Sequence, residues 1–216
     1  HTQPYAVFER AGKRVAVIGL TTPYVPHWLP ESFWSGMEFE DMVESAKHWV
    51  SVVRERENPD AIIGLFHSGF DYTYGNQDAD TPNNENASVL VGERVDGVDA
   101  ILIGHDHKLH STVVTSPSGR KVPLIDVGTA ARNLGLVSLS FGADGRLVCK
   151  ASVIALANVK PSEAYEAALA PQQLAVKAYT RKVIAKLAKP ILAKDALMGS
   201  SAFVDVVHRS MLKHTG

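Results

Sequence analysis

The sequence predicts an α/β fold built on a mixed sheet. Two short apolar runs, 60–66 and 99–103, are unbroken enough to be strands covered on both faces, and a helical pattern lies between them. Strand, helix and strand in that order imply a right-handed parallel crossover. After residue 107 the pattern changes to several strands joined by Gly-containing turns, which predicts an antiparallel run following the parallel core.

The first sixty residues predict a hairpin, a loop and a helix. Residues 5–9 and 14–20 are typical of two strands, with Gly12 at the turn between them. The segment 21–35 contains three prolines, and we expect it to form neither a helix nor a central strand. From about residue 38 apolar residues recur every three or four positions, which predicts an amphipathic helix ending before Asn58-Pro59.

The remaining elements follow from the same kinds of pattern. A polar loop is expected over 70–84, followed by a short helix over 85–95 with Asn86 as its N-cap. One long helix is predicted over 163–189, and helical spacing resumes at Ala202. The later strands are predicted at 111–115, 121–126, 135–141 and 146–154.

Composition excludes several classes of protein. The chain has 216 residues and a formal net charge of −1, from 22 basic and 23 acidic residues, so no basic surface for a nucleic-acid polymer is indicated. Its single cysteine, Cys149, excludes an intrachain disulfide and a thiolate metal cluster. No apolar run approaches the ~20 residues that a membrane-spanning helix needs. We interpret Trp28, Trp34 and Trp49 as core or loop-anchoring residues.

Histidines follow both of the central apolar strands. His67-Ser68-Gly69 follows the strand 60–66, and Gly104-His105-Asp106-His107 follows the strand 99–103. In an extended backbone residues i and i+2 point to the same side, so we expect the His105 and His107 rings to converge while Asp106 faces away. Imidazoles are ligands for zinc, manganese and iron, and the three histidines could hold an ion.

The residues alone leave other interpretations open. A histidine beside an apolar strand is often a hydrogen-bonded structural residue. The spacing His105-x-His107-x-x-His110 is similar to the motif of metallo-β-lactamase-like hydrolases, which would make the protein a mononuclear metal hydrolase, although Leu109 stands where that motif has Asp. A third possibility is a non-catalytic scaffold. The run Gly75-Asn76-Gln77-Asp78 is interpreted as an ordinary polar turn.

One family resemblance covers nearly the whole chain. The order of His67-Ser68-Gly69, a polar loop, Glu85-Asn86-Ala87 and the segment 95–107 resembles the second half of a calcineurin-like metallophosphoesterase. Within that superfamily the chain is most similar to the 5'-nucleotidase/2',3'-cyclic-nucleotide phosphodiesterase family. Residues 14–23 resemble the strand after that family's Gly-Asn-His-Asp/Glu motif, and residues 195–208 resemble the opening of its C-terminal domain.

The resemblance implies a fold and a domain organisation. Residues 1–157 would be the C-terminal part of the catalytic domain, which is half of a four-layer α/β/β/α sandwich. Residues 158–216 would be a linker helix and the beginning of the C-terminal domain, here truncated. With the other half of the sandwich missing, we expect the parallel strands to be open along one edge, and the chain to associate with itself or with a complementing half.

The resemblance also implies an activity. The parent protein would be a dinuclear-metal phosphoesterase acting on nucleotide phosphate esters, as a 5'-nucleotidase or a 2',3'-cyclic-nucleotide 2'-phosphodiesterase. His67 and His105 would ligate one divalent ion and His107 the other, the metal being Mn, Zn, Fe or Ca. The family's remaining ligands and its catalytic histidine precede the point where this sequence begins, so we expect no catalytic residue in this chain, no activity from it alone and no obligatory bound metal.

The partner would be a nucleotide or cyclic nucleotide, and the parent protein would be periplasmic or on the cell surface. Roles for His110 and Arg132, and the substrate-binding residues, stay open.

Overall fold

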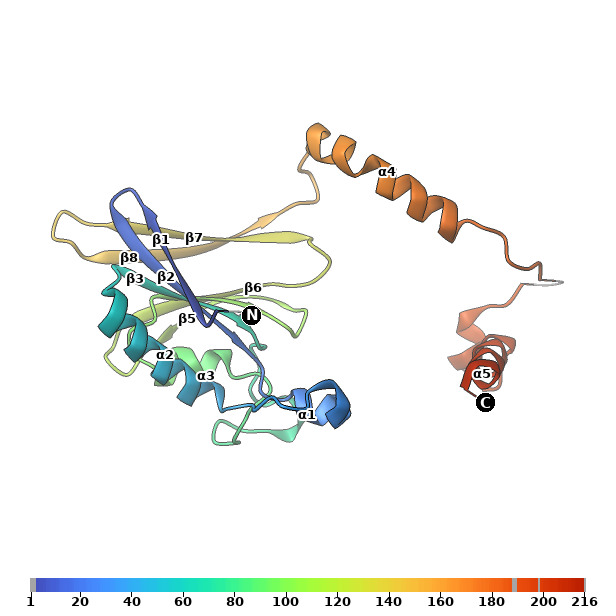
Figure 1. The fold of residues 1–216 in the computed structure, drawn as a ribbon, viewed down its shortest axis with the longest axis horizontal. Helices are drawn as coiled ribbons and strands as arrows, with labels where there is room; N and C mark the ends of the chain where they lie inside the picture. The colour runs from blue at the N-terminus through green and yellow to red at the C-terminus, as the bar shows by residue number, and fades with distance from the viewer. Residues whose placement is uncertain (1–2, 188–189, 198, 216) are drawn as a thin grey trace. The chain divides into compact units, whose positions relative to one another are not determined.

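A six-stranded mixed sheet lies at the centre of the first of two units in the chain (Figure 1). The computed structural model describes residues 3–187, 190–197 and 199–215. The first unit covers residues 1–159 and the second covers residues 160–216. The domain identities assigned to the two sides of residue 157 stay predictions.

The sheet has the strand order β1-β2-β3-β4-β6-β5. Its four inner strands run parallel, and each edge strand runs antiparallel to its neighbour. The mixed α/β fold predicted from the sequence is therefore confirmed. The strands are β1 (Tyr5–Arg10), β2 (Lys13–Thr21), β3 (Ala61–His67), β4 (Ala100–Gly104), β5 (Leu109–Thr115) and β6 (Lys121–Val127).

The position of β6 corrects two expectations. This strand does not belong to a separate antiparallel run, because it pairs in parallel with β4, with Ile101 opposite Leu124. Residues 122–126 are all buried, as suits an inner strand, whereas β5 alternates between exposed and half-buried positions along the sheet edge. The expected open edge along the parallel strands is also wrong, since β1 and β5 flank them.

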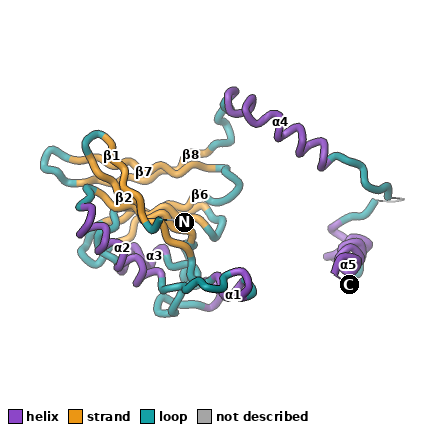
Figure 2. The backbone as a smooth tube through the Cα atoms, in the orientation of Figure 1, coloured by secondary structure: helices purple, strands orange, loops and turns teal. Residues whose placement is uncertain are grey.

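Helices cover one face of the sheet and a two-stranded ribbon covers the other (Figures 1 and 2). Helix α2 (Met42–Glu57) contacts β1 and β2, and helix α3 (Ser88–Arg94) contacts β4, β5 and β6. The ribbon consists of β7 (Asn133–Phe141) and β8 (Leu147–Ala155), which lie against β6. Gly135 permits this contact, since a Cβ there would lie 2.9 Å from a Val127 methyl group. The core between helices and sheet includes Ile18, Val53, Ile62, Ile101 and Leu124.

The ends of the two helices depend on local hydrogen bonds. Helix α2 begins at Met42 rather than near residue 38, because Asp41 accepts hydrogen bonds from the backbone N–H groups of Val43 and Glu44. It ends at Glu57, as predicted, and the C-cap Asn58 has a left-handed backbone (φ 42°) and precedes a proline. The prediction that Asn86 caps α3 is wrong: Ala87 is the N-cap, and it makes no side-chain cap.

The proline-rich segment is more ordered than predicted. It contains the one-turn helix α1 (Val25–Trp28) and the 3-10 turn η1 (Glu31–Phe33), so the expectation that it holds no helix is wrong. Pro26 is tolerated because residues in the first helical turn need no backbone N–H group, which proline lacks. The Trp34 indole N–H donates to the Leu29 carbonyl at 3.0 Å, which anchors the loop as predicted for that tryptophan.

The second unit contains helices in which no described residue is buried. They are α4 (Glu163–Thr180), the 3-10 segment η3 (Ala193–Leu197) and α5 (Ala202–Thr215). Helix α4 ends at Thr180, short of the predicted end at Lys189, which lies outside the described residues. The exposed fraction of Ile184 is 92%, so no packing supports a longer helix there. Within the described part of the chain, every helix is too short or too polar to cross a membrane.

Candidate metal centre

The sheet brings the two predicted histidine segments together at one edge. His67 is the last residue of β3, where it lies between Thr21 of β2 and Gly104 of β4. His105 follows β4 directly. Because the carboxyl ends of parallel strands meet at the same edge, the topology alone places these two imidazoles side by side.

The two rings face each other through nitrogen atoms. His105 Nδ1 lies 3.4 Å from His67 Nε2, and the ring planes are 69° apart. Two nitrogens that bind one tetrahedral ion at ~2.1 Å would be about 3.4 Å apart, so this spacing fits a shared metal. Burial lowers the pKa of His67, and the neighbouring His105 and His107 lower it further. His67 therefore favours the neutral form that a metal ligand requires.

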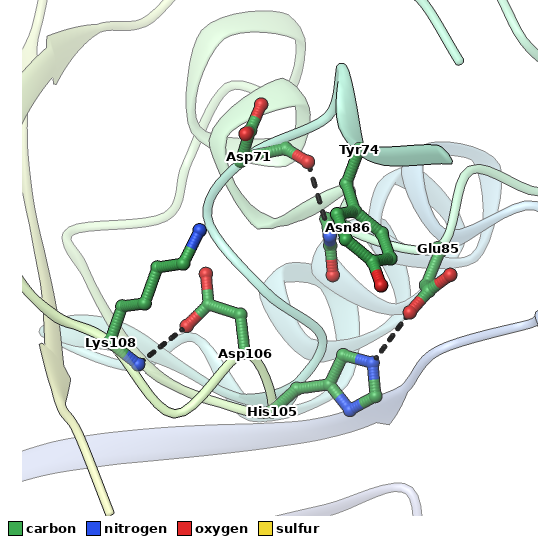
Figure 3. A pocket seen from close by; sticks show the side chains of 7 residues that line it. All are labelled: Asp71, Tyr74, Glu85, Asn86, His105, Asp106 and Lys108. Atoms are coloured by element: carbon green, nitrogen blue, oxygen red, sulfur yellow. Dashed lines mark hydrogen bonds and ion pairs between the residues drawn. The ribbon is translucent and has the colours of Figure 1, made fainter. Parts of the chain in front are cut away.

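Glu85 fixes the orientation of the His105 ring (Figure 3). His105 Nε2 lies 3.1 Å from Glu85 Oε1, and both side chains are largely buried, 17% and 12% exposed. A carboxylate only accepts hydrogen bonds, so Nε2 carries the proton and Nδ1 directs its lone pair toward His67. No periodicity in the sequence connects Glu85 with His105, so this contact was not predictable beyond the place of Glu85 in the motif Glu85-Asn86-Ala87.

Four buried residues fasten the His67 segment to the Glu85 segment. The Ser68 hydroxyl donates to the Glu85 carbonyl and accepts from the Ala87 N–H group, both at 2.9 Å. Asn86 Oδ1 accepts from the Gly69 N–H group at 3.0 Å, and a Cβ on Gly69 would lie 2.4 Å from that oxygen. This contact explains why Asn86 does not cap α3. The two segments therefore hold Glu85 at a fixed place beside His105.

The loop that carries His105 and His107 is not an extended strand. Strand β4 ends at Gly104, and the φ angles of His105 and His107 are 156° and 60°. Alternation along a strand therefore does not apply to them, and the predicted reason for their convergence is wrong. His107 is exposed. Among the described residues, no group of three or more His, Cys, Asp or Glu side chains is arranged to hold an ion, so His67 and His105 approach each other through one nitrogen each without a third ligand.

Asp106 holds this loop in place through two backbone hydrogen bonds, and its carboxylate bonds the Lys108 backbone rather than the His105 ring (Figure 3). Its Oδ2 accepts from the Phe70 N–H group at 3.0 Å, and its Oδ1 accepts from the Lys108 N–H group at 3.2 Å. These bonds lower the pKa of the Asp106 carboxyl despite its partial burial, which alone would raise it. The carboxylate thus ties the histidine loop to the segment that follows Gly69.

His110 lies in a buried polar cluster rather than beside the facing histidines. Its ring stacks on Phe70 at 4.4 Å, and its Nε2 is buried with no partner among the described residues. Asp126 lies opposite it in the sheet and is fully buried. Burial raises the pKa of Asp126 to about 7, and the Asp106 carboxyl adds to the rise. Arg132 lies in the exposed loop before β7.

Trp28 is a site residue that the sequence analysis missed. Its indole stacks on the His105 ring with centroids 5.2 Å apart and planes 29° apart. Tyr24 contacts Trp28 edge-on at 5.8 Å and stacks on His27 at 3.9 Å. The exposed fraction of Trp28 is 44%, so it is not a core residue. No pattern in the sequence connects α1 with the histidine loop.

A cavity of about 240 Å³ adjoins the Glu85 side of His105 (Figure 3). The run 75–78, which follows the lining residue Tyr74 in the sequence, is a polar turn as predicted, and Gln77 accepts a hydrogen bond from the Glu85 N–H group at 3.1 Å. Its lining residues are Asp71, Tyr74, Glu85, Asn86, His105, Asp106 and Lys108.

Comparison with known proteins identifies relatives of this chain. No protein-family model matches the sequence. A 5'-nucleotidase of Vibrio parahaemolyticus is 32% identical over 106 residues, which are 49% of this chain and 18% of the relative. The chain thus spans about a fifth of the length of this curated relative.

Solved structures share the fold. A 5'-nucleotidase precursor from Thermus thermophilus superposes with a TM-score of 0.66 at 26% identity, covering 85% of this chain and 36% of that one. The calcineurin-like phosphoesterase YfkN from Bacillus subtilis superposes with a TM-score of 0.66 at 24% identity, covering 83% of this chain and 59% of that one. The second likeness supports the fold alone.

Proposed function

We propose that this chain is part of a 5'-nucleotidase, because it is similar in sequence and fold to proteins of that name, and that His67 and His105 form part of a metal centre that hydrolyses nucleotide phosphate esters. The observation that carries the proposal is the facing pair His105 Nδ1 and His67 Nε2, 3.4 Å apart. The parent substrate would be a 5'-nucleotide, in keeping with the names of two relatives, or alternatively a 2',3'-cyclic nucleotide.

The proposed roles of this chain's residues follow from their contacts. His67 and His105 would ligate one ion, and the exposed His107 would ligate a second. Glu85 would keep the proton on His105 Nε2 and leave Nδ1 free to bind. When bound, a divalent ion such as Mn, Zn, Fe or Ca would supply a Lewis acid for a phosphoryl oxygen and acidify a water molecule.

Ligand count limits what these residues do alone. Two ions ~3.5–4 Å apart need bridging and terminal ligands beyond three imidazoles. We therefore propose that the isolated 216 residues do not hydrolyse phosphate esters, and that activity requires a form of the protein that supplies further ligands.

We also propose an exported parent protein, since one structural relative is a 5'-nucleotidase precursor. Association with a second copy or a complementing half is proposed from the exposed apolar side chains of the ribbon.

Isothermal titration of the chain with Zn²⁺ and with Mn²⁺ tests the ligand assignment. His105→Ala should weaken binding ~10-fold or more, because it removes one of two facing ligands. His208→Ala is the matched control, since His208 lies on α5 in the second unit. Equal affinity in wild type and His105→Ala would contradict the proposal.

Hydrolysis is tested in parallel. Turnover of a 5'-nucleotide and of a chromogenic phosphodiester should be absent from the 216-residue chain and present in the longer protein. In the longer protein His105→Ala should abolish it. Turnover by the isolated chain that survives His105→Ala would overturn both the ligand assignment and the predicted inactivity.

A further inference from the structure

We propose that Trp28 is a positioning residue: its indole holds one face of the His105 imidazole so that Nδ1 stays turned toward His67. This inference rests on the proposed metal centre, because it concerns how one of the proposed ligands is oriented. No resemblance or sequence pattern assigns such a role to Trp28.

The His105 side chain needs contacts from outside its own loop. His105 lies beyond the end of β4, and its φ of 156° is a conformation that L residues rarely adopt. The sheet therefore does not set the direction of its ring. Glu85 bonds the ring edge at Nε2, and Trp28 stacks on a ring face, 5.2 Å between centroids. The Glu85 hydrogen bond restrains movement of the His105 ring within its plane, and the Trp28 indole restrains tilting of the ring out of that plane.

The segment that carries Trp28 is anchored to the other histidine. The Thr22 N–H group donates to the His67 carbonyl at 2.8 Å, and the Thr22 hydroxyl accepts from the Tyr24 N–H group at 3.2 Å. Tyr24 in turn contacts the edge of the Trp28 indole. A continuous set of contacts thus runs from the His67 backbone through Thr22, Tyr24 and Trp28 to the His105 ring, so both imidazoles share one support.

Burial does not explain the position of Trp28. Its exposed fraction is 44%, whereas Trp49, which packs near Tyr5, is partly buried against the core. A large indole left that exposed gains little from hydrophobic burial at this place. Its ordered contacts are with Tyr24 and with His105, which favours a role toward the histidine over a role in the core.

The experiment compares Trp28→Ala with Trp28→Phe, which keeps an aromatic face. Trp49→Phe is the control, because it alters a tryptophan that packs near Tyr5 and His48 instead. The first readout is nuclear Overhauser contact between the His67 and His105 rings in metal-free protein. The second is the affinity for Zn²⁺ by isothermal titration.

Trp28→Ala should lose the ring contact and bind Zn²⁺ about 3- to 10-fold more weakly, the range expected for one aromatic contact. Trp28→Phe and Trp49→Phe should stay within about 2-fold of wild type. An unchanged ring contact together with unchanged affinity in Trp28→Ala would overturn the inference. If wild-type protein binds no Zn²⁺, the proposed metal centre fails, and the ring contact alone then decides the role of Trp28: its loss in Trp28→Ala supports the role, and its persistence overturns it.

Discussion

Replacing Ser68 by alanine tests the hydrogen bonds that hold the candidate site together. Ser68 is fully buried, and its hydroxyl bonds both the Glu85 carbonyl and the Ala87 N–H group at 2.9 Å. Alanine leaves that buried acceptor and that buried donor unpaired. Each unpaired group costs ~1–3 kcal/mol, so Ser68→Ala should lower the free energy of unfolding by ~2–6 kcal/mol.

Urea unfolding followed by tryptophan emission is the appropriate assay. All three tryptophans, at positions 28, 34 and 49, lie in the first unit, so their emission reports the unfolding of that unit alone. A unit of this size shifts its melting temperature by ~2–4 °C per kcal/mol, which predicts a fall of ~4–24 °C in Ser68→Ala.

Ser51→Ala is the matched control. The Ser51 hydroxyl bonds Glu55 on the exposed side of α2, so its removal should change stability by less than ~0.5 kcal/mol. If Ser68→Ala is no less stable than Ser51→Ala at the same denaturant dependence, then the buried hydroxyl does not hold the two segments together. The positioning of Glu85 would then need another cause.

Three further outcomes are expected. Because burial raises the pKa of Asp126 to about 7, the folded protein binds that proton more tightly than the unfolded chain. The resulting stability is complete below about pH 4 and is lost as the pH rises through about 7. In wild type the urea midpoint should therefore fall as the pH rises over that range, and in Asp126→Asn this fall should be smaller. Parallel plots of midpoint against pH for the two proteins would refute this. Asp41→Ala removes the α2 cap and should cost ~1 kcal/mol in the same assay, while an unchanged midpoint would speak against the cap. Light scattering should show the wild-type chain as larger than a monomer and Leu136→Lys, on the exposed ribbon, as smaller than wild type; a monomeric wild type would exclude self-association.

Sequence patterns were sufficient for the strands that position the histidines. β3 and β4 are unbroken apolar runs bounded by polar residues, and parallel strands place their carboxyl ends together whatever their neighbours are. The pairing of β6 with β4 was not predictable in the same way. Pro123 in β6 is typical of an edge strand, yet the pairing with β4 begins at Leu124, one residue later.

The supporting residues of the candidate site were harder to predict than the histidines. Glu85 reaches His105 from a loop and Trp28 from the end of the one-turn helix α1; both are distant from His105 in the sequence, and neither lies in a periodic segment. The convergence of His105 and His107 was expected from strand alternation, but β4 ends one residue too early for that rule to apply. Three-dimensional contacts of single residues leave no trace in local hydrophobic patterns.

The insertion of β6 between β4 and β5 affects the order in which the chain assembles. β5 and β6 are joined by the short turn 116–120, so we expect this hairpin to form early and to dock onto β4 afterwards. Loop 105–108 joins β4 to β5, so we expect it to take its final course when the hairpin docks. The contact between His105 and His67 should then form late, and an ion that needs both rings should bind completed molecules better than partly assembled ones.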